Sequence, residues 1–187
     1  MPGKRIKAGH IDELPPASKV GPYRNIVIHT GINNINNNRY RQSNQSLIGN
    51  LESKIHSYSQ MYPKSKIFVS LLLPSRLRTL NRRITDFNNL LLDMTCRIDR
   101  VSIIENGIFG DILTNDHGRW KSSGSESNEF EPNLNDVLHL GKKGIRLFAI
   151  SIKDSIIKKR PQSCERHDAG RGQYRDALVR GTDNHDS

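Results

Sequence analysis

Two short apolar runs constrain the fold of this 187-residue chain more than any other feature. They cover residues 25–30, which read NIVIHT, and residues 66–73, which read KIFVSLLL. Both are rich in β-branched residues and end at turn-forming residues, Gly31 and Pro74, and this pattern predicts β-strands. Since the runs are almost continuously apolar, we expect both faces to be buried, as in a parallel sheet covered by helices.

Helical patterns occupy the intervals between these runs. Apolar residues recur at steps of three and four over residues 43–58, 80–98 and 145–156, and the last helix is expected to begin near Gly141. A third strand is predicted at residues 100–104 and a weaker one at residues 5–8. The alternation predicts an α/β fold, in which right-handed crossovers connect parallel strands.

The length of the chain suits one domain. Residues 105–135 contain several glycines and little periodicity, which is typical of a long functional or mobile loop. From Pro161 onward the chain is polar and has no apolar stripe. We therefore predict one domain over residues 1–160 and a disordered tail over residues 161–187.

The net charge of +10 raises the question of nucleic-acid binding. From Lys158 to the C-terminus, seven Lys and Arg stand against five Asp and Glu, so the remaining +8 is spread over the first 157 residues. No long basic run with interleaved aromatic residues occurs. The charge distribution therefore favours a generally solvated basic surface, with a nucleic-acid-associated module as the alternative.

Targeting and cofactor signals are sparse. No apolar run approaches the roughly 18 residues of a membrane span, and no apolar region follows the charged N-terminus as in a signal peptide. Cys96 and Cys164 are too few for a disulfide framework and lack metal-ligand spacing. We expect an intracellular, cytoplasmic protein without a metal, a cofactor or a membrane partner, and the oligomeric state stays open.

Candidate chemical groups follow the predicted strands, because ligands of open α/β sheets bind beyond the carboxyl ends of the strands. Asn33 could donate its side-chain amide to an oxyanion, although an Asx turn explains it equally well. Asp136 and His139 precede the last helix at a spacing that lets the carboxylate orient the imidazole as a general base. The simpler alternative is that Asp136 begins the helix and His139 is an ordinary loop histidine.

Taken together, these blocks resemble the SGNH (GDSL-like) hydrolase family over roughly residues 5 to 158. The segment NIVIHTGINN resembles the family's third block, usually Gly-x-Asn-Asp, and DVLHLGKKGIRLFAISIKDSI resembles the fifth, Asp-x-x-His before a C-terminal helix. The segment IKAGHIDEL, with Gly9, resembles the second block. The likeness is closest to esterase-like domains associated with retroelement-encoded proteins of animals.

The resemblance implies a three-layer α/β/α sandwich with a flavodoxin-like parallel sheet and an ester substrate. Gly9 and Asn33 would donate to the oxyanion, His139 would be the base and Asp136 would orient it. Asn34 stands where the family usually has Asp, a position that tends to support the loop.

The family's first block, Gly-Asp-Ser after the first strand, is absent from the 187 residues, so the first strand is expected to be missing too. Ser18, Ser70 and Ser75 are available, but none is predicted on a strand-to-helix elbow near the start. The sequence therefore predicts an ester hydrolase-like domain without its nucleophile, which is either inactive or a truncated part of an active esterase. The missing strand would also leave an apolar sheet edge open to pairing.

Overall fold

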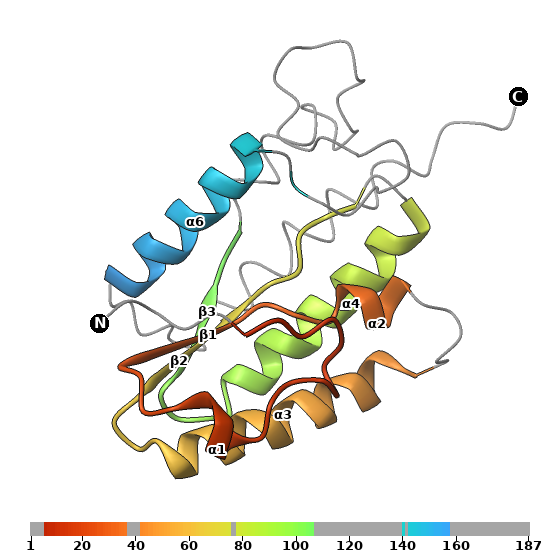
Figure 1. Ribbon diagram of the computed structural model, residues 1–187. Helices are drawn as coiled ribbons and strands as arrows, with labels where there is room; N and C mark the ends of the chain where they lie inside the picture. Colours follow the sequence, from red (N-terminus) through yellow and green to blue (C-terminus); the bar gives the residue numbers. More distant parts are fainter. Residues whose placement is uncertain (1–5, 37–41, 76–77, 107–139, 141, 158–187) are drawn as a thin grey trace, which may run out of the picture. The chain divides into compact units, whose positions relative to one another are not determined.

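The computed structural model describes residues 6–36, 42–75, 78–106, 140 and 142–157 (Figure 1). The elements are α1 (Ala17–Val20), β1 (Asn25–Ile28), α2 (Ile32–Asn36), α3 (Asn44–Met61), β2 (Lys66–Ser70), α4 (Arg78–Thr95), β3 (Val101–Ile104) and α6 (Lys142–Ile157). The three main predicted strands and three predicted helices are present. The short helices α1 and α2 were not predicted.

The three strands form a parallel sheet in the order β1-β2-β3. Ile28 pairs with Val69, and Val69 pairs with Ile103, so the carboxyl ends of the strands reach the same edge of the sheet. The predicted α/β class with a parallel sheet is thereby confirmed. The weak strand predicted at residues 5–8 is wrong for residues 6–8, which have no regular structure.

Helices α3 and α4 pack against each other, and α4 also packs against β3. The apolar stripe predicted for α4 is buried along its length, at Leu80, Ile84, Phe87, Leu91 and Met94. Ser43 caps the start of α3, because its hydroxyl accepts a hydrogen bond from the Ser46 N–H (3.1 Å). These two helices thus form where the periodicity predicts them, and their buried faces supply a large part of the core.

One edge of the sheet is open within the described part of the chain. There β1 pairs only with β2. Lys66 donates its N–H to the Arg24 carbonyl (3.0 Å), so the backbone groups of Arg24 face β2. Backbone groups of successive strand residues point alternately to the two sides of the strand, and those of Val27 therefore point away from β2. The Val27 side chain is 38% exposed. Within the described residues, β1 is therefore an edge strand.

The chain divides into two compact units. The first contains the sheet, α1, α2, α3 and α4, over described residues 6–72 and 78–104. The second contains residues 73–75 and 105–106 together with Leu140 and α6. Within it, the Ser151 hydroxyl on α6 donates to the Glu105 carbonyl (3.3 Å). The predicted tail at 161–187 lies outside the described residues.

Candidate functional site

The segment that carries Gly9 folds into a tight turn. Glu13 donates its backbone N–H to the His10 carbonyl, and Leu14 donates to the Ile11 carbonyl, both at 3.2 Å. The Ile11 side chain is 1% exposed, so it anchors the turn in the core of the first unit. The turn is therefore held by its own backbone and by one buried side chain.

Asn34 joins this turn to the helix that follows β1. Its Oδ1 atom accepts a buried hydrogen bond from the Ile11 N–H (2.9 Å). Asparagine and aspartate both present an acceptor oxygen at this point, so either residue can make this bond. Asn34 therefore supports the turn as an Asp at this position could.

Gly9 and Asn33, which are 24 positions apart in the sequence, lie side by side in the fold. A Cβ atom at Gly9 would lie 3.6 Å from Asn33 Nδ2. Both residues are exposed, and Asn33 lies on α2, just beyond the carboxyl end of β1. A side-chain amide and the backbone N–H of a residue beside it are, as donor types, suited to a negatively charged oxygen at this edge.

The Gly9 N–H is already engaged. It donates to Glu13 Oε2 at 2.6 Å, and the His10 N–H donates to the same oxygen at 3.1 Å. Two backbone donors therefore converge on one carboxylate oxygen of the chain's own turn. The sequence did not predict this interaction, because it depends on how the turn closes.

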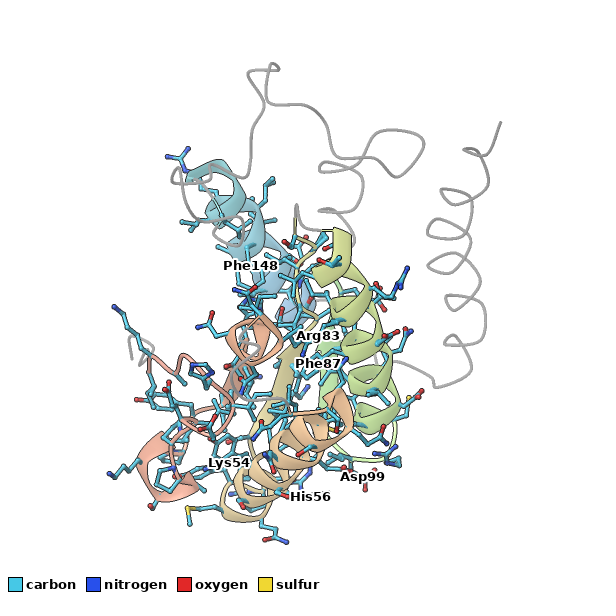
Figure 2. The ribbon with its side chains drawn as sticks, turned by 90° about the vertical axis from the view of Figure 1, so that its right-hand side faces the viewer. Lys54, His56, Arg83, Phe87, Asp99 and Phe148 are labelled. Atoms are coloured by element: carbon cyan, nitrogen blue, oxygen red, sulfur yellow. The ribbon has the colours of Figure 1, made fainter. Side chains whose placement is uncertain are left out.

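Three side chains from the end of α3 and its cap hold the N-terminal segment in place. Lys54 Nζ donates to the Leu14 carbonyl (3.0 Å), Tyr58 Oη to the Pro15 carbonyl (2.7 Å) and Tyr62 Oη to the Ala17 carbonyl (2.6 Å). Figure 2 shows Lys54 on α3. Burial raises the pKa of Tyr58 above its ordinary value, which keeps the phenol protonated as a donor. The four-residue spacing of these side chains places them on one helix face, a signal that sequence analysis could have used.

His29 and Ser70 form a second polar pair at the same sheet edge. They follow paired positions of β1 and β2, and His29 Nδ1 lies 3.1 Å from Ser70 Oγ. The His29 residue is exposed on one side, whereas the protein surrounds its ring elsewhere, and this desolvation lowers its pKa to about 4.

The candidate replacement nucleophiles differ in exposure. Ser70 is 1% exposed and Ser75 is 0% exposed, so neither hydroxyl is open to a substrate in this conformation. Ser18 lies on the surface of α1. The predicted base His139 and its orienting residue Asp136 lie outside the described residues.

Metal-binding and membrane-spanning features are missing from the described residues. No group of three or more His, Cys, Asp or Glu side chains there could hold a metal ion. None of the helices in that part of the chain combines the length and apolar character needed to cross a membrane.

Comparisons with known proteins bear on the fold. No family model matches the chain, and no curated protein matches it. A solved structure of a protein proposed to be a platelet activating factor from Streptococcus pneumonia is similar, with a TM-score of 0.55 and 24% sequence identity. The match covers 72% of this chain and 60% of that one. At this identity the likeness supports the α/β fold alone.

Proposed function

We propose that this chain carries the oxyanion-binding part of an SGNH-type ester hydrolase-like domain. The observation that supports this proposal is that Asn33 Nδ2 lies 3.6 Å from the position that a Cβ atom at Gly9 would take, beyond the carboxyl end of β1. These are the two residues to which the sequence resemblance assigns oxyanion donation.

The chemistry would rest on charge stabilisation. When a nucleophile attacks an ester carbonyl, negative charge develops on the carbonyl oxygen, and donors placed beforehand stabilise it without reorganising. Asn33 and Gly9 would supply those donors. By the resemblance, His139 would act as general base and Asp136 would fix its tautomer.

The covalent step is the part that this chain lacks. The Gly-Asp-Ser block is absent from the 187 residues, and Ser70 and Ser75 are buried. Ser18 is exposed, but it lies on the short helix α1, which follows no strand in the described residues. We therefore propose that any hydrolysis by this chain proceeds by attack of water and forms no acyl-enzyme. Residual catalysis on the order of 10³-fold over water is known for another serine hydrolase system without its triad.

The test compares hydrolysis of p-nitrophenyl acetate by the wild-type chain, Asn33→Ala, His139→Ala and Asn36→Ala. Asn36 is an exposed asparagine on the same helix and serves as the matched control. We expect slow hydrolysis above the buffer rate, roughly a tenfold or greater loss in Asn33→Ala and His139→Ala, and no loss in Asn36→Ala. Equal rates for all four proteins would contradict the proposal, as would covalent labelling of a serine by a fluorophosphonate.

The net charge of +10 supports a second candidate, a basic module associated with nucleic acid in a retroelement-derived protein. An ion pair joins Arg97 to Glu52 (3.4 Å). The chain has 29 Lys and Arg but only 19 Asp and Glu, so ion pairs within the chain cannot neutralise all of its positive charge. This candidate predicts affinity that falls steeply with added salt.

A further inference from the structure

The Glu13 carboxylate occupies the Gly9 N–H, which is one of the two donors that the proposed function assigns to an oxyanion, and the neighbouring His10 N–H. Its Oε2 atom lies 2.6 Å from the Gly9 nitrogen and 3.1 Å from the His10 nitrogen. The same oxygen would lie 3.0 Å from a Cβ at Gly9, on the side where Asn33 Nδ2 also approaches. The turn thus already contains an anion bound as a small carboxylate ligand would be.

We propose that Glu13 is an internal competitor that closes an anion site formed by Gly9, His10 and Asn33, and that a small carboxylate can take its place. An N–H that donates at 2.6 Å to one oxygen has no second hydrogen to offer a ligand. Two negative oxygens at the same donors would also repel each other. The inference rests on the proposed function for the catalytic meaning of the site, whereas its anion-binding property follows from the hydrogen bonds alone.

The structure lets Glu13 leave without unfolding the turn. Both of its hydrogen bonds are exposed, so the side chain can rotate into water. Backbone bonds at the turn, the Ile11–Asn34 bond and the bonds from Lys54 and Tyr58 remain when the carboxylate is gone. A site without its internal anion therefore keeps its donors in place.

The experiment is chemical rescue with acetate, which has the carboxylate chemistry of the side chain it replaces. The amide resonances of Gly9 and His10 are followed by ¹⁵N–¹H NMR while sodium acetate is added to wild type and Glu13→Ala at constant ionic strength. We expect acetate to return both resonances of Glu13→Ala toward their wild-type positions, with an affinity at least about tenfold above that of wild type. Each 1.4 kcal/mol corresponds to one such factor of ten.

Three further variants sharpen the result. Asp12→Ala removes an exposed carboxylate of the adjacent residue and should leave acetate affinity at the wild-type level. Glu13→Gln keeps the side-chain length without the charge and should fall between wild type and Glu13→Ala. Adding Asn33→Ala to Glu13→Ala should weaken acetate binding by severalfold, because the site then has one donor fewer.

The proposal fails if acetate leaves the Gly9 and His10 amides of folded Glu13→Ala and Glu13→Gln unmoved, or if it binds wild type equally well. Dispersed spectra establish that the variants are folded. Rescue by acetate together with no effect of Asn33→Ala on ester hydrolysis would retain the anion site and reject the hydrolase. An effect of Asn33→Ala on hydrolysis without acetate rescue would retain the hydrolase and reject the anion site.

Discussion

At the scale of single residues, Asn34 makes a buried hydrogen bond that an aspartate at the same position could also make. The position needs a buried acceptor for the Ile11 N–H, and the asparagine Oδ1 supplies one at 2.9 Å. A buried N–H without a partner would cost on the order of 1–3 kcal/mol. An Asn34→Asp variant would therefore change the charge of the side chain but keep an acceptor for the hydrogen bond that supports the Gly9 turn.

His29 gives a pH dependence whose sign follows from its surroundings. Desolvation lowers its pKa from 6.5 to about 4 in the folded chain, so the unfolded chain binds a proton between these values and the folded chain does not. Stability should therefore fall as pH drops through this window, with no contribution from His29 well above pH 6.5. Ring-proton NMR of His29 should show a midpoint below 6.5, and His29→Gln should unfold less steeply with acid.

A midpoint at or above 6.5 in the folded protein would contradict this prediction. So would identical acid unfolding of wild type and His29→Gln, measured by guanidinium denaturation at pH 4.5, 5.5 and 7. Ser70→Ala removes the hydroxyl that lies 3.1 Å from Nδ1 and leaves the backbone position of His29, directly after β1, unchanged in sequence. Because desolvation is the cause of the lowered pKa, we expect this variant to keep the direction of the pKa shift.

At the scale of elements, Asn88 on α4 continues the hydrogen bonding of β2 after its last paired residue. Asn88 Oδ1 accepts from the Leu72 N–H (2.9 Å), and Asn88 Nδ2 donates to the Leu72 carbonyl (3.0 Å). Replacing Asn88 by Ala leaves both groups of Leu72 without this partner, so we expect a decrease of about 1–3 kcal/mol in the free energy of unfolding. Urea denaturation followed by far-UV circular dichroism measures this decrease.

The neighbouring Asn89 on the same helix provides the matched control, because Asn88 alone supplies the two bonds to Leu72 described above. We expect Asn89→Ala to change the free energy of unfolding by no more than about 0.5 kcal/mol. Asn88→Asp keeps the acceptor, removes the donor and brings a negative charge toward the Leu72 carbonyl, so it should also destabilise the fold. Equal stability of Asn88→Ala and wild type would show that water replaces both bonds.

The sequence predicted the elements whose signal is periodic and missed those that depend on tertiary structure. The stripe from Leu80 to Met94 and the apolar runs of β1 and β2 place α4 and the strands, because burial dictates their pattern. Helix α2 has five residues in an asparagine-rich run, too short for a stripe. The hydrogen bonds of Glu13 were missed for a similar reason, since a carboxylate in a polar turn has many possible partners before the turn is closed.

At the scale of the whole molecule, the open edge of β1 and the absent Gly-Asp-Ser block belong to one pattern. The described sheet ends at a strand whose Val27 is 38% exposed. An edge of this kind can pair with another strand, and proteins usually cover or charge such edges. The site residues Gly9 and Asn33 lie just beyond the carboxyl end of this same strand, so a strand added at the β1 edge would bring its own carboxyl end toward them if it ran parallel.

The net charge of the whole chain gives the last prediction. Basic residues spread over a surface attract the phosphates of a nucleic acid without distinguishing its base sequence. The logarithm of the affinity for the nucleic acid then falls linearly with the logarithm of the salt concentration. We expect fluorescence anisotropy with a 20-nucleotide single strand to show binding at about 20 mM salt that disappears by about 200 mM, with no preference among sequences. Glu13→Ala should bind slightly more tightly and Asn33→Ala should be unchanged, because the first removes a negative charge and the second removes none. Affinity that stays unchanged between about 20 and 200 mM salt, or no binding at about 20 mM salt, would contradict binding driven by the basic surface, and the basic-module candidate would then be rejected.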